Sequence, residues 1–300
     1  MRKEYYSRMV RNERGDRIRT VELSDPELEC ESLRFLTMHS SALGGRGDLS
    51  IFAPPELHST TSAPIVLLLH GVYGSHWSWF FKGAAHRTAA DLIASGRIRP
   101  MLLVAPSDGL YGDGSGYISH SGRDYEAWIT ADVLECIRSR FPCADEDSSV
   151  FIVGLSMGGY GALRLGAKHP ALFRAVSAHS AITHIDQMGL FTFEPFPVLG
   201  IRPDEMDLLH WMERNRSALP SLRFDCGIDD PLIEGNRRLH HELNQLAIPH
   251  DYEEREGAHT WPYWRSQLGA SLLFFEAALR DSTDIGNPPC KPDITIHQLP

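Results

Sequence analysis

A serine set between glycines, directly after a short apolar run, constrains the fold of this chain more than any other feature. The apolar run 149–153 leads into Gly154-Leu155-Ser156-Met157-Gly158, and apolar residues then follow with helical spacing as far as Lys168. Short β-branched runs of this kind are typical of buried parallel strands. The order of strand, sharp turn and helix predicts that the turn presents the Ser156 hydroxyl clear of the backbone, since glycine tolerates dihedral angles that crowd other residues.

The rest of the chain alternates in the same way between short apolar runs and helical patterns. Strands are expected at 33–39, 48–53, 64–69, 101–105, 172–178, 222–226 and 252–255, and helices at 80–95, 125–141, 232–247 and 261–279. Strands that alternate with helices favour parallel pairing with helices on both faces. The chain therefore predicts an α/β fold with a mostly parallel central sheet flanked by helices.

The 300 residues show no linker-like break in composition, so one large domain is expected at 31–280. Residues 1–30 are polar and charged and are interpreted as an N-terminal extension. Residues 281–300 hold several prolines and are interpreted as a C-terminal tail. A stretch rich in Phe and Pro at about 185–220 is interpreted as a short cap-like excursion from the domain.

The composition limits the kinds of molecule that this protein is expected to bind. A net charge of −10 argues against nucleic acid. No apolar stretch is long enough to cross a bilayer, and no signal peptide is expected, so a membrane partner is not predicted. The five cysteines are odd in number and lack metal-like spacing, which favours reduced thiols and a cytoplasmic location. The chain's fifteen histidines contain no H-E-x-x-H or H-x-x-E-H spacing, so no metal is predicted. The oligomeric state stays open.

A serine hydroxyl is a poor nucleophile unless a base takes its proton, and the base is usually a histidine oriented by a carboxylate. His259 follows the last expected strand, whereas His240 and His241 fall within an expected helix. The acid is expected after the strand at 222–226. Asp229 and Asp230 both occupy that position, and position alone leaves the choice open.

A developing oxyanion needs backbone N–H donors. One donor is expected at Met157, which follows the serine and opens a helix. The other is expected in the loop after the strand at 64–69, where His70-Gly71-Val72 follows, and Val72 N–H is the candidate.

At these segments the chain resembles the “Putative esterase” family of α/β-hydrolases, which includes esterase D, tributyrin esterase-like enzymes and a group of mycolyltransferases. The resemblance is carried by Leu67-Leu68-Leu69-His70-Gly71, by 154–162, by Cys226-Gly227-Ile228-Asp229-Asp230-Pro231-Leu232 and by 257–264. It implies an α/β-hydrolase fold, no cofactor, and Asp230 as the acid. It is closest to the tributyrin esterase-like branch, although Thr260 stands where the family often has Asp.

The function that the resemblance implies is that of a serine carboxylesterase, which hydrolyses short-chain acyl esters of small molecules through an acyl-enzyme intermediate. Alternatives are S-formylglutathione hydrolase, feruloyl or acetyl esterase, or acyltransferase activity, and a catalytically inert binding protein on the same scaffold. Five aromatic residues are candidates for walls of a substrate pocket: Trp77, Trp79, Phe191, Phe193 and Phe196.

Overall fold

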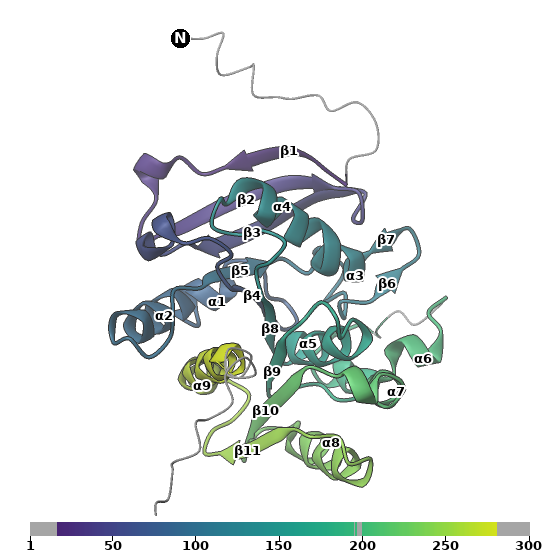
Figure 1. Ribbon diagram of the computed structural model, residues 1–300. Coiled ribbons are helices and arrows are strands. Elements are labelled where there is room, and N and C mark those ends of the chain that lie inside the picture. The colour runs from purple at the N-terminus through teal and green to yellow at the C-terminus, as the bar shows by residue number, and fades with distance from the viewer. Residues whose placement is uncertain (1–16, 195, 197–199, 281–300) are drawn as a thin grey trace, which may run out of the picture.

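One sheet organises the molecule. The computed structural model describes residues 17–194, 196 and 200–280, and Figure 1 shows how they surround this sheet. Within these residues the strand order is β1-β2-β3-β5-β4-β8-β9-β10-β11. The strands are β1 Ile18–Leu23, β2 Leu33–Ser40, β3 Gly45–Phe52, β4 Ile65–Leu69, β5 Leu102–Pro106, β8 Val150–Leu155, β9 Ala175–His179, β10 Ser221–Gly227 and β11 Asp251–Arg255, with a small separate ladder of β6 Ser119–His120 and β7 Arg123–Asp124. From β5 to β11 in this order, neighbouring strands pair in parallel. The pairs β1–β2, β2–β3 and β3–β5 are antiparallel.

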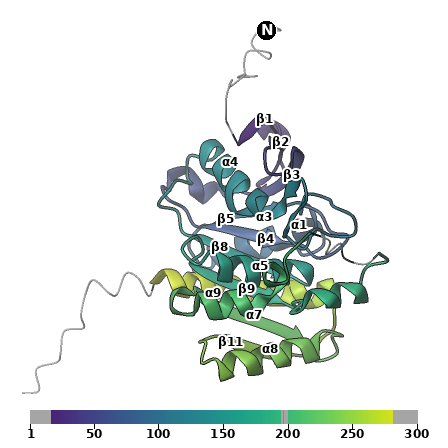
Figure 2. The ribbon, with the colours of Figure 1, turned by 90° about the vertical axis from the view of Figure 1, so that its right-hand side faces the viewer.

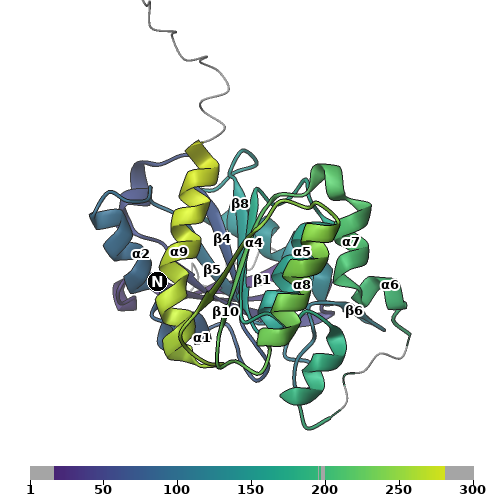
Figure 3. The ribbon, with the colours of Figure 1, turned by 90° about the horizontal axis from the view of Figure 1, so that it is seen from below.

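Helices cover both faces of the sheet, as Figure 3 shows from below. One face carries α1 Ser78–Phe81, α2 Ala85–Ala94 and α9 Trp261–Arg280. The other carries α3 Tyr125–Ala127, α4 Val133–Arg140, α5 Met157–Lys168, α7 Leu208–Arg214 and α8 Ile233–Gln245, and the short α6 Pro203–Met206 lies beside α7. This arrangement confirms the α/β fold that the alternation predicts.

Burial on both faces explains the continuous apolar runs. Every residue of β4 is buried, because β4 lies between β5 and β8 with helices above and below. On the α9 face, the rings of Phe151 and Phe275 stack with centroids 4.8 Å apart. The apolar side chains of α9 thereby seal one side of the central strands.

The N-terminal interpretation is corrected in part. Residues 1–16 lie outside the described residues, but β1 pairs with β2 and extends the sheet, so the segment from Ile18 is not an extension. Ile18 and Val21 are half-buried and the polar residues between them are exposed, and a register shift between Arg19 and Glu22 interrupts the regular alternation of this edge strand. The predicted tail at 281–300 lies outside the described residues. The helix expected at 125–141 is interrupted by a π-helical segment, Trp128–Asp132.

The excursion after β9 packs on α5, as Figure 2 shows. It contains a 3₁₀ helix at Ile185–Leu190, then α6 and α7. The Tyr160 hydroxyl donates to the Met206 carbonyl at 2.8 Å. Arg164 is buried and pairs with Glu126 at 2.7 Å and with Glu205 at 3.0 Å. Burial alone would raise the pKa of Glu126, but His169, Arg164 and Lys168 outweigh it and lower that pKa to about 2. These bonds hold the excursion to the helix that follows Ser156.

The described helices include none with the length and apolar character needed to cross a bilayer.

Candidate active site

Ser156 stands in the turn between β8 and α5, in a backbone conformation that residues other than glycine rarely adopt. Its φ is 55° and its ψ is −120°. The Ser156 N–H donates to the His179 carbonyl at 3.0 Å, and the Ser156 carbonyl accepts from the Ile182 N–H at 3.1 Å. A Cβ on Gly158 would overlap the Leu69 carbonyl, so a larger residue has no room there. The neighbouring backbone thus imposes the sharp turn that the glycine pattern predicts.

His259 lies in the loop between β11 and α9 and reaches the serine. Its Nε2 is 3.0 Å from Ser156 Oγ. Its Nδ1 lies 2.9 and 3.1 Å from the two carboxylate oxygens of Asp230. Because an ionised carboxylate only accepts hydrogen bonds, Nδ1 carries the proton and Nε2 is the acceptor of the serine O–H. The ring is held by Phe191, stacked with centroids 4.5 Å apart, and by Trp264, which meets it edge-on.

The two candidate acids separate clearly. Asp230 is buried, and its carboxylate also accepts the Leu232 N–H at 2.9 Å. Asp229 is exposed, and its N–H donates to the Gly257 carbonyl at 2.9 Å. Of the two neighbours, Asp230 is therefore the carboxylate that contacts His259. The Asp230 carboxylate can bind the Leu232 N–H of the turn and the His259 imidazole at the same time, because its two oxygens offer several lone pairs.

The loop after β4 passes close over the serine. A Cβ on Gly71 would lie 3.1 Å from Ser156 Cβ. Among the described residues, the N–H groups of Val72 and Met157 donate to no protein acceptor. Met157 is also the first residue of α5, where unsatisfied N–H groups and the helix dipole favour negative charge. The two predicted donors are thus close to Ser156 in the chain or in space and have unused hydrogen-bonding capacity.

A buried histidine that the sequence reasoning did not select fixes this loop. His70 donates from Nδ1 to the Gly71 carbonyl at 2.7 Å and accepts the Asp108 N–H at Nε2, at 3.0 Å. The Tyr117 hydroxyl donates to the His70 carbonyl at 3.0 Å, and burial raises the pKa of Tyr117 well above its usual range. The position of His70, directly after a fully buried strand, is the signal that marks it in the sequence.

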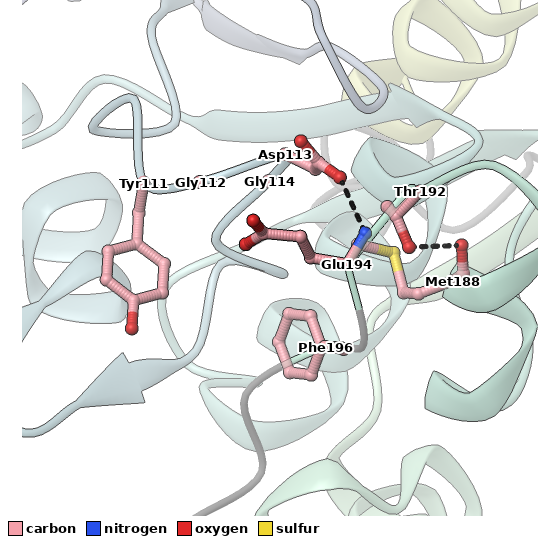
Figure 4. Close-up of a pocket in the computed structure, with 8 residues that line it drawn as sticks. All are labelled: Tyr111, Gly112, Asp113, Gly114, Met188, Thr192, Glu194 and Phe196. Atoms are coloured by element: carbon pink, nitrogen blue, oxygen red, sulfur yellow. Dashed lines mark hydrogen bonds between the residues drawn. The ribbon is translucent and has the colours of Figure 1, made fainter.

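A cavity of about 180 Å³ has a lining that does not include Ser156, Asp230 or His259, and Figure 4 draws the residues that line it. The loop 111–114 forms one wall, and Met188, Thr192, Glu194 and Phe196 form the other. Gly114 joins the cavity to the turn, because a Cβ there would meet the Met157 sulfur and would lie 3.4 Å from Val72 Cγ1.

The predicted aromatic pocket residues are only partly brought together. Phe191 contacts His259, and Phe196 lines the cavity. Phe193 is 96% exposed and Trp77 is 42% exposed, and neither is among the cavity's lining residues, so their roles stay predictions. The prediction for Trp79 is corrected. Its ring is fully buried, packs edge-on against Trp261 and donates to the Leu69 carbonyl, so it belongs to the core.

A second Asp–His–Ser chain of hydrogen bonds lies in the core. His179 Nδ1 is 2.8 Å from Asp225 Oδ2, and His179 Nε2 is 3.1 Å from Ser271 Oγ. Asp225 also accepts from Arg223 at 2.5 Å and from the Tyr263 hydroxyl at 2.8 Å. We call these five residues the Asp225 cluster. The His179 backbone carbonyl, which receives the Ser156 N–H, links the cluster to the serine turn.

The described residues hold no group of three or more His, Cys, Asp and Glu side chains arranged around a metal position.

Comparison with known proteins identifies the family of this chain. The family described as “Putative esterase” matches residues 40–214. An acetyl esterase of Caldicellulosiruptor saccharolyticus is 27% identical over 220 residues, which are 67% of this chain and 79% of that relative.

Solved structures share the fold. A ferulic acid esterase superimposes with a TM-score of 0.68 at 24% identity, covering 86% of this chain and 98% of that one. An S-formylglutathione hydrolase of Staphylococcus aureus superimposes with a TM-score of 0.67 at 19% identity, covering 85% and 98%. Because the family match spans more than half of the chain, this protein belongs to the “Putative esterase” family, and it is a serine ester hydrolase with an α/β-hydrolase fold.

Proposed function

We propose that this protein is a carboxylesterase that hydrolyses short-chain acyl esters through an acyl-enzyme on Ser156. The unbroken chain of hydrogen bonds from Asp230 through His259 to Ser156 Oγ carries the proposal. A serine linked in this way to an oriented imidazole loses its proton as it attacks a carbonyl carbon.

The steps follow from this geometry. His259 Nε2 takes the serine proton while Oγ bonds to the carbonyl carbon, and the N–H groups of Val72 and Met157 receive the oxyanion. His259 then gives the proton to the departing alcohol, which leaves an acyl ester on Ser156. Water attacks that ester while His259 takes a proton from it, and His259 then gives this proton to Ser156 Oγ as the acid is released. Loss of one oxyanion donor typically lowers the rate by about 10²- to 10³-fold.

The short acyl group and the small-molecule substrate are supported by the site and by a relative. The cavity between the loop 111–114 and the excursion measures about 180 Å³, and a relative that matches over 79% of its own length is named an acetyl esterase. We also propose a cytoplasmic location. It is supported by the cysteines of the described residues, since Cys30, Cys136, Cys143 and Cys226 are all free thiols.

Hydrolysis of p-nitrophenyl acetate by Ser156→Ala tests the proposal. We expect turnover to fall at least about 10³-fold, because the nucleophile is lost while binding is kept. Retained turnover by this variant would overturn the proposal. A panel of p-nitrophenyl esters from acetate to decanoate defines the acyl length, with the acetate end expected to be fastest. A feruloyl ester and S-formylglutathione belong in the panel because the solved relatives carry those names.

A further inference from the structure

Asp113 lies between the loop that carries Val72 and the excursion after β9. On the loop side, the Asp113 carbonyl accepts the Tyr73 N–H at 3.1 Å. The neighbouring Tyr73 hydroxyl lowers the pKa of Asp113. Asp113 is therefore bound to the Tyr73 backbone, and its carboxylate interacts with the Tyr73 side chain.

The same carboxylate holds the excursion. Asp113 Oδ2 accepts the Phe193 N–H at 3.0 Å and the Glu194 N–H at 3.3 Å. The rings of Tyr73 and Phe193 also lie near each other, with centroids 6.4 Å apart and planes tilted by 56°. Figure 4 shows the Asp113 carboxylate directed at the backbone nitrogen of Glu194. One side chain thus joins the two walls of the cavity.

Tyr73 needs this support. Its φ is 54°, in the left-handed region that a bulky residue rarely adopts without surrounding constraint. Val72 and Tyr73 are the central residues of a turn that the Gly74 N–H closes on the Gly71 carbonyl at 3.1 Å, so the Tyr73 conformation is coupled to the segment that carries the Val72 N–H. The bonds to Asp113 reinforce this turn.

We propose that Asp113 is a positioning and specificity-determining residue, which sets the direction of the Val72 N–H and the width of the cavity together. The inference rests on the proposed esterase function and deepens it. Without the carboxylate, the oxyanion donor is misdirected and the excursion is released from the loop. The rate with small esters then falls, while the relative preference for longer acyl groups rises.

Asp113→Ala and Tyr73→Phe separate the two effects. For Asp113→Ala we expect kcat with p-nitrophenyl acetate to fall about 10- to 100-fold, less than or near the loss of a whole oxyanion donor. We expect the ratio of kcat/KM for octanoate to that for acetate to rise at least about fivefold, as the cavity wall is freed. Tyr73→Phe keeps the two bonds from Asp113 to the excursion and removes only the longer bond from the Phe193 N–H to the Tyr73 hydroxyl, at 3.4 Å. Its kcat is therefore expected to fall by a smaller factor, and its acyl-length ratio is expected to change much less than that of Asp113→Ala.

Asp145→Ala is the matched control. Asp145 also holds a loop, since its carboxylate accepts the Ser62 hydroxyl at 2.7 Å and the Asp147 N–H at 3.0 Å, but it belongs to neither wall of the cavity. We expect its kcat and acyl-length ratio to match the wild type. A merely structural role of Asp113 predicts the same pattern for both alanine variants.

The outcomes distinguish this inference from the proposed function. Folded Asp113→Ala with wild-type kcat and acyl-length ratio overturns the inference, while an inactive Ser156→Ala leaves the esterase proposal standing. An inactive wild type, or an active Ser156→Ala, overturns the proposed function itself. If Asp113→Ala does not fold, Asp113→Asn and Tyr73→Phe decide: reduced kcat in both supports the inference, and wild-type kinetics in both overturns it.

Discussion

The Asp230–His259–Ser156 site and the Asp225 cluster have nearly the same hydrogen-bond geometry. In the site, the distances from His259 to the carboxylate and to the serine oxygen are 2.9 and 3.0 Å. In the cluster, the corresponding distances from His179 are 2.8 and 3.1 Å. His179 is the last residue of β9 and His259 follows β11, so both histidines lie near the carboxyl ends of parallel strands. Geometry within the three residues therefore does not separate them.

The surroundings of the two histidines do separate the site from the Asp225 cluster. The His259 side chain is 15% exposed and that of His179 is fully buried. Ser156 lies close to the N–H groups of Val72 and Met157, which donate to no acceptor among the described residues. Ser271 lies inside α9, where the helix uses the backbone N–H groups. Ser271 Oγ is also held at 2.7 Å by Ser177 Oγ. Access, free N–H donors and a hydroxyl bonded to the histidine alone distinguish a reactive serine from a structural one.

Replacing the site carboxylate has the largest expected effect. For Asp230→Asn we expect kcat with p-nitrophenyl acetate to fall by about 10⁴-fold, because the amide no longer selects the imidazole tautomer that accepts the serine proton. Steady-state kinetics measures the loss, and thermal unfolding checks that the variant is folded. A loss of less than tenfold would mean that Asp230 does not orient His259.

The matching change in the cluster acts on stability. Asp225→Asn leaves the buried Arg223 with only part of its charge compensated, since Glu253 is its other partner. We expect the free energy of unfolding to fall by about 3 kcal/mol, measured by urea denaturation. The remaining folded protein is expected to keep its kcat within about threefold of wild type, in contrast with Asp230→Asn. A stable Asp225→Asn with a 10⁴-fold loss of kcat would contradict the comparison.

Glycine at the two serines is expected to change stability in opposite directions. Ser156→Gly relieves the positive φ, which costs about 1–3 kcal/mol in other residues, although glycine loses more entropy on folding. We expect a gain of up to about 1 kcal/mol. Ser271→Gly places glycine inside a helix and removes the bonds to Ser177 and His179, so we expect a loss of about 2 kcal/mol. Ser156→Ala keeps the strain and serves as the control. Equal effects at both positions would show that the turn is not strained.

The smallest expected effect is on how the free energy of unfolding depends on pH in the acid range. Burial alone would raise the pKa of Asp225, but His179, Arg223 and Tyr263 outweigh it and hold that pKa below its ordinary value. A carboxylate with a lowered pKa in the folded state stabilises the fold above its unfolded pKa, near 4, and this stabilisation is lost as pH falls further. We therefore expect the free energy of unfolding to fall less steeply below about pH 4 in Asp225→Asn than in the wild type. Parallel curves from pH 6 to pH 2 would contradict the assignment.

Local pattern predicts Ser156, because a strand, a sharp turn and a helix each leave a mark in neighbouring residues. The order of the segments along the chain favours His259, and the structure places its Nε2 3.0 Å from Ser156 Oγ. Local pattern does not distinguish Asp229 from Asp230, because the two residues are adjacent in the chain. Only the direction of the turn decides which carboxylate faces His259. The family resemblance favoured Asp230, which the structure places against His259. The Asp225 cluster left no local mark, because Ser271 lies mid-helix and meets His179 only through the packing of α9 on β9.

Two errors have physical reasons of a similar kind. Residues 18–23 alternate weakly and carry charge, yet pairing with β2 is sufficient to order them as an edge strand. The composition around Trp79 suits a pocket wall as well as a core, and only the packing of Trp261 and the Leu69 carbonyl against that ring decides between them.

The most direct test of the account is where a fluorophosphonate probe bonds to the folded protein. We expect one adduct, mapped by mass spectrometry to Ser156, with the same labelling rate in Ser271→Ala and none in Ser156→Ala. An adduct on Ser271, or no adduct on an enzyme that hydrolyses p-nitrophenyl acetate, would contradict the claim that accessibility and free N–H donors make Ser156 the reactive serine.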